Sequence, residues 1–240
     1  MRLPTCWRLD RGSQDVDAVI YRGPASSPGC PEAALRVVRA AGLTADYVGP
    51  GERRGLDKAT LAACRVYVQP GGGELEEAWP HLAPARRLLR QFVTGGGAYI
   101  GFCLGAYLAG RDPGLGLLPG DTDQYIISPD AEIRHDRDTI VSLTWAGQPR
   151  QVFFQDGPVI LVPESPHVDI LATYQNGLCA AAVCRVGDGA VGVAGPHPEA
   201  TPDWFTAIGL RPPPRDGRDL AIDLIRRTVA STAARSRRSV

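Results

Sequence analysis

The order of apolar and polar positions predicts two halves with different architecture. In the first half, short apolar runs alternate with segments in which apolar residues recur at helical spacing. The runs are 16–21, 44–49, 65–69 and 98–102, and the helical segments are 30–42, 84–97 and 103–110. Strands that alternate with helices indicate βαβ units, and therefore a mainly parallel sheet with right-handed crossovers.

The second half has the pattern of antiparallel strands. Residues 138–145 and 150–155 are two β-rich runs separated by a short polar turn, which predicts a β-hairpin. Further strands are expected at 168–174, 179–186 and 190–195, and an amphipathic helix at 220–230. The fold predicted is therefore a flavodoxin-like α/β three-layer sandwich, with a mostly parallel central sheet and an antiparallel β-hairpin extension.

The same pattern suggests how the chain is divided. Residues 1–15 form a polar lead-in, 16–211 one domain, and 212–240 a C-terminal helix with a basic tail. The lead-in has no apolar run of the kind found in a secretory signal, and no stretch approaches 18 uninterrupted apolar residues. We therefore expect a cytoplasmic protein with no membrane partner.

Charge and cysteine usage exclude several classes of function. Lys plus Arg and Asp plus Glu both number 26, and this balance does not indicate a nucleic-acid partner. The six cysteines are scattered without a CxxC pair, which is typical neither of a disulfide framework nor of a zinc site. No metal and no cofactor are expected.

The strongest chemical signal is the segment 101–106, in which Cys103 stands between Gly101 and Gly105 at the junction of a strand and a helix. This is the cysteine form of a nucleophile elbow, whose sharp turn requires small neighbours. The start of the helix favours a thiolate, and the backbone N–H of Leu104 faces the space where an oxyanion would develop. The alternative is an ordinary buried cysteine in a glycine-rich turn.

Two further segments follow predicted strands. His197 and Glu199 come after the run 190–195, so that His197 can accept the thiol proton while Glu199 orients its ring. Gly71, Gly72 and Gly73 come after the run 65–69, where glycines let backbone N–H groups approach an oxyanion. Taken singly, the histidine could be a surface residue and the glycines a flexible turn.

Together these segments resemble the class I glutamine amidotransferase-like superfamily. Within it, the chain is most similar to the N-terminal domain of biotin–protein ligases and to free-standing proteins built from that domain. The resemblance is carried by GGGAYIGFCLGAYLAG (95–110) and GPHPE (195–199), with weaker support from YVQPGGG (67–73) and VFFQDGP (152–158). It implies that Cys103, His197 and Glu199 form a catalytic triad, and that Gly71, Gly72, Gly73 and Leu104 take the oxyanion positions.

The resemblance leaves the activity open. The chain lacks the segment that would bind a biotinyl-adenylate, so it is not expected to be a biotin ligase by itself. The favoured function is Cys-dependent cleavage or transfer at an amide C–N bond of a small substrate such as glutamine, with a separate acceptor enzyme as partner. The alternatives are a non-catalytic binding or regulatory module that retains the pocket, and a Cys peptidase-type hydrolase.

Several other residues are candidates for substrate binding. Tyr21, Arg22 and Gly23 end the first strand, and Arg22 could hold a substrate carboxylate. Gln155 and Asp156 follow the hairpin and could line the pocket. Asp121, Asp123 and Gln124 could contact an amino group or be ordinary loop residues.

Overall fold

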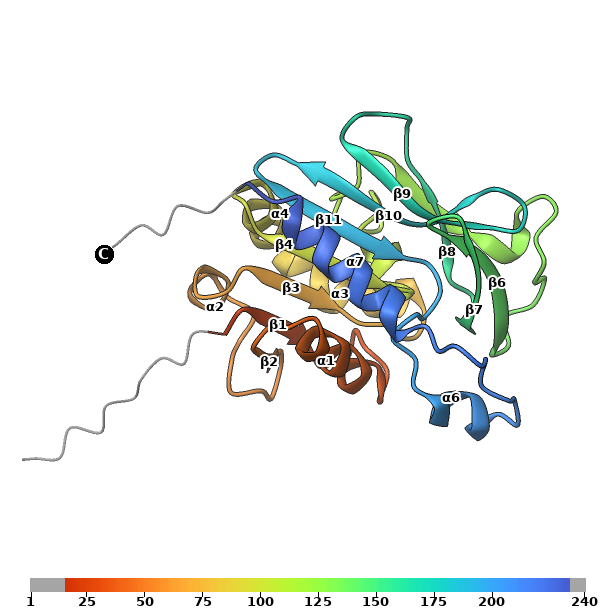
Figure 1. Cartoon of the computed structure of the whole chain (residues 1–240). Helices are drawn as coiled ribbons and strands as arrows, with labels where there is room; N and C mark the ends of the chain where they lie inside the picture. Colours follow the sequence, from red (N-terminus) through yellow and green to blue (C-terminus); the bar gives the residue numbers. More distant parts are fainter. Residues whose placement is uncertain (1–15, 234–240) are drawn as a thin grey trace, which may run out of the picture.

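A nine-stranded sheet forms the centre of the computed structural model, which describes residues 16–233 (Figure 1). The expected lead-in and the end of the basic tail lie outside the described residues. The sheet has the order β2-β1-β3-β4-β11-β10-β9-β6-β7. Its strands are β1 (Ala18–Tyr21), β2 (Ala45–Val48), β3 (Val66–Gln69), β4 (Ala98–Phe102), β6 (Thr139–Trp145), β7 (Gln148–Phe154), β9 (Val168–Tyr174), β10 (Cys179–Val186) and β11 (Gly189–Ala194).

The sheet joins a parallel part to an antiparallel part. Strands β2, β1, β3, β4 and β11 pair in parallel, and β10, β9, β6 and β7 continue the sheet with antiparallel pairings. The predicted α/β fold with an antiparallel extension is therefore confirmed. Strand β11 links the two parts, because it is antiparallel to β10 and parallel to β4.

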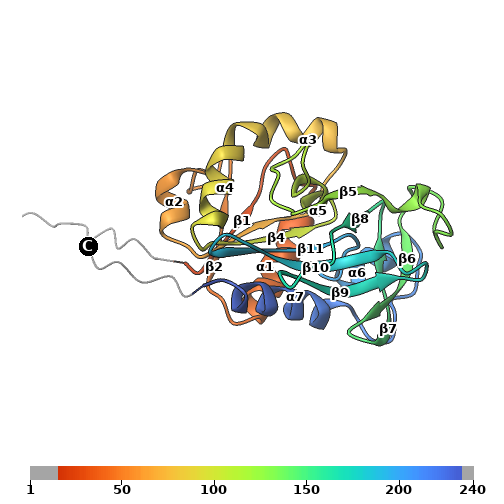
Figure 2. The same cartoon turned by 90° about the horizontal axis from the view of Figure 1, so that it is seen from above.

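Helices cover both faces of the parallel part (Figure 2). One face carries α1 (Cys30–Ala40) and α7 (Arg218–Ala230), and the other carries α2 (Lys58–Ala62), α3 (Leu75–Leu82), α4 (Arg86–Thr94) and α5 (Leu104–Leu108). Strands β1, β3 and β4 are buried along their whole length, which explains why they read as continuous apolar runs.

Some elements differ from the prediction. The helix expected at 84–97 is the 3-10 turn η1 (Ala83–Ala85) followed by α4, and α3, which precedes them, was not expected. The unpatterned segment before the hairpin contains β5 (Asp121–Gln124) and the 3-10 turn η2 (Tyr125–Ile127), and β5 pairs with β8 (Pro158–Leu161) outside the main sheet. Helix α6 (Pro202–Ala207) was also not expected. No helix within residues 16–233 is both long and apolar enough to cross a membrane.

The register of β4 and β11 determines where the chemistry can lie. Ala194 at the end of β11 is opposite Phe102 at the end of β4. The residues that follow these two parallel strands therefore emerge side by side at the carboxyl edge of the sheet, where α/β proteins bind ligands.

Candidate active site

Cys103 occupies the turn between β4 and α5 in a backbone conformation that few non-glycine residues adopt, with φ 49° and ψ −107°. Its N–H donates to the Ala194 carbonyl at 2.9 Å. A Cβ atom at Gly101 would overlap the Gly105 carbonyl, and one at Gly105 would overlap the Gln69 carbonyl. The expected need for glycine on both sides of the cysteine is therefore confirmed.

His197 and Glu199 are buried beneath the same edge. His197 is 2% exposed and Glu199 is completely buried. The backbone N–H of His197 donates to the Phe153 carbonyl at 2.9 Å. The ring Nδ1 of His197 lies 2.8 Å from Glu199 Oε1. A buried carboxylate at Nδ1 fixes the orientation of the ring and leaves Nε2 for other partners.

The thiol of Cys103 interacts with the imidazole of His197. Burial is the largest influence on the pKa of His197 and lowers it, but the charges of Cys103 and Glu199, and hydrogen bonds to both, raise this pKa well above its ordinary value. The Cys103 Sγ also lies 3.4 Å from the Gln155 carbonyl, to which the thiol can donate. Cys103 and Glu199 are thus both close enough to His197 to influence its pKa.

Aromatic rings hold the imidazole from the side. The Trp204 ring, on α6, lies edge-on to the His197 ring with centroids 5.3 Å apart, and the Phe153 ring is 6.1 Å away. Phe205 packs on Phe153 from the same helix. These contacts restrict the ring in a way that its hydrogen bonds alone would not.

The glycines after β3 divide into two sets. Gly72 and Gly73 line the space beside Cys103, as does Leu104. Gly71 does not line it; a Cβ atom there would overlap His197 Cε1 and lie 3.3 Å from Nδ1. The contact with the ring gives a reason for glycine at position 71 that differs from the predicted oxyanion role.

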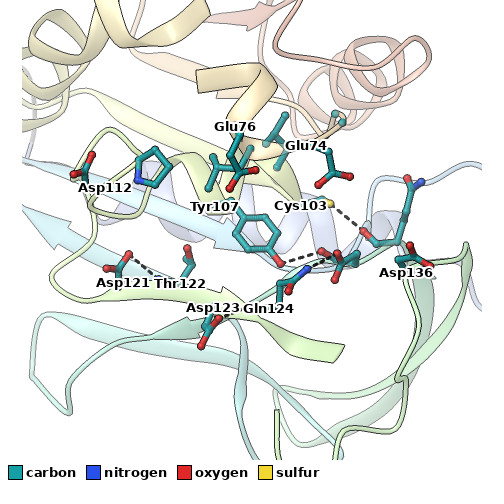
Figure 3. Close-up of a pocket in the computed structure, with 17 residues that line it drawn as sticks. Glu74, Glu76, Cys103, Tyr107, Asp112, Asp121, Thr122, Asp123, Gln124 and Asp136 are labelled. Atoms are coloured by element: carbon teal, nitrogen blue, oxygen red, sulfur yellow. Dashed lines mark hydrogen bonds between the residues drawn. The ribbon is translucent and has the colours of Figure 1, made fainter. Parts of the chain in front are cut away.

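A cavity of about 520 Å³ opens beside Cys103, and its size suits a small molecule (Figure 3). Gln155 and Asp156, both expected near the pocket, line it. The backbone carbonyl of Asp156 accepts a hydrogen bond from the Tyr107 hydroxyl at 3.0 Å. All four residues of β5 also line the cavity.

The structure does not place Tyr21, Arg22 and Gly23 in the lining of the cavity. The Arg22 guanidinium instead pairs with Glu52 at 2.6 Å and lies 3.8 Å from the centroid of the Tyr47 ring. The expectation that Arg22 holds a substrate carboxylate is therefore not supported, because its hydrogen-bonding groups are already engaged elsewhere.

Comparisons with known proteins show the family of this chain. The model of the family described as "Biotin-protein ligase, N terminal" matches residues 16–113. The imidazole glycerol phosphate synthase subunit HisH of Synechococcus sp. (strain JA-3-3Ab) is 31% identical over an alignment of 147 residues, and the alignment covers 54% of this chain and 67% of that protein. The chain belongs to the class I glutamine amidotransferase superfamily.

Other members of the class I glutamine amidotransferase superfamily match over different extents. HisH of Synechococcus elongatus is 33% identical over 87 residues, covering 33% of this chain and 40% of that protein. A glutamine amidotransferase structure from Thermotoga maritima has a TM-score of 0.55 at 15% identity and covers 90% of both chains. The structure of a putative GMP synthase component from Thermoplasma acidophilum has a TM-score of 0.54 at 13% identity, covering 90% of this chain and 94% of that one. These two structures show that the amidotransferase fold is shared.

Sequence reasoning missed several residues of this amidotransferase-like site. Tyr107 lies one helical turn after Cys103, a spacing that could have shown that both face the same space. Glu74, Glu76, Asp112 and Asp136 also line the cavity, but they lie in segments with no recognisable pattern. Among the described residues, no group of three or more His, Cys, Asp or Glu is arranged to hold a metal ion.

Proposed function

We propose that this chain cleaves an amide C–N bond in a small molecule, with Cys103 as nucleophile, His197 as acid and base, and Glu199 as the group that orients the imidazole. One observation carries the proposal, namely the coupled thiol, imidazole and carboxylate beside a cavity of small-molecule size. The buried Glu199 stabilises the imidazolium that must form when the thiol gives up its proton.

The proposed reaction has two stages. The Cys103 proton passes to His197, and the sulfur attacks the amide carbonyl carbon to form a tetrahedral intermediate. His197 then protonates the nitrogen, so that the C–N bond breaks, the amine or ammonia leaves, and a thioester remains. In the second stage His197 takes a proton from water, the resulting hydroxide attacks the thioester, and the carboxylic acid leaves as the thiol is restored.

Backbone donors would stabilise the tetrahedral intermediates of both stages, the one formed by attack of the sulfur and the one formed by attack of the hydroxide. Leu104 begins α5 directly after the nucleophile, and Gly72 and Gly73 line the same cavity. A Cβ atom at Gly72 would come within 2.5 Å of the Leu104 side chain, so the two segments are in close contact. Backbone N–H groups from both segments would donate to the carbonyl oxygen as its negative charge develops, in the manner of an oxyanion hole.

The relatives support an amidotransferase-type activity that serves another enzyme. The HisH proteins are subunits of imidazole glycerol phosphate synthase, and the Thermotoga structure is a glutamine amidotransferase. By analogy, the ammonia or amine released here would pass to a separate acceptor enzyme. Glutamine is therefore the reference substrate against which other amides are compared.

The test is amide hydrolysis by the parent and by Cys103→Ala. Release of ammonia or amine from glutamine and from a panel of small amides is measured for both, with Cys184→Ala as a buried-cysteine control in β10. We expect Cys103→Ala to reduce turnover to the uncatalysed background, because no covalent route remains, and Cys184→Ala to retain it. A parent that cleaves no amide, or a Cys103→Ala variant as active as the parent, would overturn the proposal.

Selective alkylation gives an independent measurement. Burial raises the pKa of Cys179 and of Cys184 to about 12, with the neighbouring thiol adding to the effect at Cys179. These thiols are therefore protonated at neutral pH and react slowly. Under limited iodoacetamide treatment, peptide mapping should find Cys103 modified before either of them, and the reverse order would argue against an activated Cys103.

A further inference from the structure

The walls of the cavity beside Cys103 are strongly acidic. Seven of its lining residues carry carboxylates, and none of the described residues that line it is Arg, Lys or His. The seven are Glu74, Glu76, Asp112, Asp121, Asp123, Asp136 and Asp156. None of them forms an ion pair within residues 16–233. The negative charge of the wall is therefore directed at whatever occupies the cavity.

The carboxylates face the cavity from more than one side. Figure 3 shows Glu74 and Glu76, at the start of α3, on one side of Tyr107, and Asp121 and Asp123 of β5 on the other. These segments are far apart in the sequence and meet only through the fold. A ligand in the cavity would thus have carboxylates on both flanks.

The acidic groups are close enough to influence one another. Burial is the main cause that raises the pKa of Asp156, and the charges of Glu74 and Asp136 raise this pKa further. The pKa of Tyr107 is raised by burial first, and then by the charges of Asp156 and Cys103 among others. Glu74 and Asp136 therefore act electrostatically on Asp156, and Asp156 and Cys103 both act on Tyr107.

Asp156 has an unused acceptor in this wall. Its Oδ2 accepts a hydrogen bond from Gln124 Nε2 at 2.8 Å, but its Oδ1 is buried and has no hydrogen-bond partner within the described structure. No donor offsets the burial of this oxygen, and burial is the main cause that raises the pKa of Asp156.

A nearby arginine does not neutralise the wall directly. The Arg111 side chain donates from Nε to the Gly120 carbonyl at 3.0 Å and from Nη2 to the Pro119 carbonyl at 3.3 Å. Its contact with Asp121 is made by the backbone N–H instead, at 3.0 Å. The guanidinium thus binds backbone carbonyls and leaves the carboxylates of the cavity for a ligand.

We propose that the amide bound beside Cys103 is a cation, a small aliphatic amide that carries one or more ammonium groups and no free carboxylate. This inference rests on the proposed function, since it assigns the substrate class of the same site. The ammonium groups lie between the two acidic walls, and the amide carbonyl lies at Cys103. An acidic cleft with no lining cation attracts such a molecule before contact and repels carboxylates.

Glutamine is a poor match for this cavity. Its ammonium group suits the acidic wall, but its carboxylate would meet like charges and no lining guanidinium or ammonium group. A positively charged amide of similar size has no such conflict. The proposed substrate of this chain is therefore not glutamine, the reference substrate suggested by its relatives.

The test compares three acetamides of similar length on the full chain. N-acetylputrescine is cationic, N-pentylacetamide is neutral and N-acetyl-γ-aminobutyrate is anionic. Calorimetric titration of the Cys103→Ala variant measures binding without turnover. We expect N-acetylputrescine to bind at least about tenfold more tightly than the neutral amide and the anionic amide not to bind, with the cation's advantage falling as salt rises.

Variants that remove carboxylates test which residues cause the preference for the cationic amide. The double variant Glu74→Gln/Asp136→Asn, in the Cys103→Ala background, should lose most of the preference for N-acetylputrescine, because its binding of the cation should weaken much more than its binding of the neutral amide. Glu77→Gln is the matched control, because Glu77 is exposed on the same helix and does not line the cavity. Melting temperatures check that each variant is folded.

The outcomes distinguish this inference from the proposed function. Equal binding of the three probes, or faster cleavage of glutamine than of N-acetylputrescine by the parent, overturns the cationic substrate and leaves the hydrolase proposal standing. Selective binding of the cation by Cys103→Ala, with a parent that cleaves no amide, overturns the hydrolase instead and supports a cation-binding cavity. Selective binding together with cleavage of the cationic amide supports both.

Discussion

The two sides of the candidate site differ in how they are held. His197 and Glu199 are buried at the end of β11, with a 2.8 Å contact between them and aromatic rings alongside. The acidic side is built from a helix start, loops and the small β5–β8 sheet, and Glu74, Asp123 and Asp136 are exposed there. The proposed chemistry thus depends on the packed core, and the proposed selectivity depends on segments that can vary without disturbing that core.

This comparison indicates where substitutions should act. A change among the buried groups alters the proton positions on which cleavage depends, so it should reduce kcat. A change in the acidic wall alters only the charge presented to the ligand, so it should act mainly on KM. The following predictions test that division, beginning with the residue expected to have the largest effect.

Glu199→Gln should cost the most activity among the positioning residues. The amide can donate to Nδ1 and so favour the wrong imidazole tautomer, and losses of about 10²–10⁴ in kcat are typical when such a group is removed. Amide hydrolysis by the folded variant measures the loss. Glu199→Asp, which keeps the charge, should recover part of it, and equal losses in both variants would show that the carboxylate acts only through packing.

The same variant should also change the pH dependence. The charges of Cys103 and Glu199 hold the pKa of His197 above its ordinary value, although burial, its largest single influence, lowers it. The imidazolium therefore persists until the pH rises through that raised pKa. In Glu199→Gln one negative charge is lost and the pKa falls, so the alkaline limb of the kcat/KM profile should move to lower pH. An unmoved limb would contradict the coupling.

The buried side of the site could be predicted from the sequence because its constraints are local. The turn at Cys103 needs glycine at 101 and 105, and a glycine on each side of a cysteine after an apolar run is visible in a single sequence. His197 follows a second apolar run, and parallel strands end at a common edge. These two facts suffice to bring the thiol and the imidazole together.

The acidic side could not be predicted because its constraints are long-range. Strand β5 has no apolar alternation and forms only by pairing with β8, more than thirty residues later. Helix α3 contains Pro80 and follows three glycines, so its pattern is not typical of a helix. Arg22 does follow a strand, but its pairing with Glu52 depends on a loop 30 residues away.

Gly71→Ala should disturb the buried side without touching the acidic wall. The added methyl group would overlap His197 Cε1, and the ring must move to accommodate it. A displacement of this size in a positioning element is expected to lower kcat by about 10–10² with little change in KM. Gly55→Ala is the control, because a Cβ atom there makes only an ordinary contact, with Asp57 at 3.4 Å. A parent-like kcat for Gly71→Ala would show that the ring is not closely held.

Arg22→Ala should have the smallest effect. It tests whether a residue at the same edge of the sheet, but outside the cavity lining, contributes to substrate binding. Arg22 follows β1 at the same edge of the sheet, yet it lies outside the cavity lining and pairs with Glu52 and Glu32. If it bound a substrate carboxylate, its removal would raise KM strongly. Because its side chain is about two-fifths exposed and its ion pairs are at the surface, we expect kcat/KM to stay within about twofold of the parent and the melting temperature to change little. Steady-state kinetics with the preferred amide measures this, and a large rise in KM would return Arg22 to the binding site and contradict a purely acidic cavity.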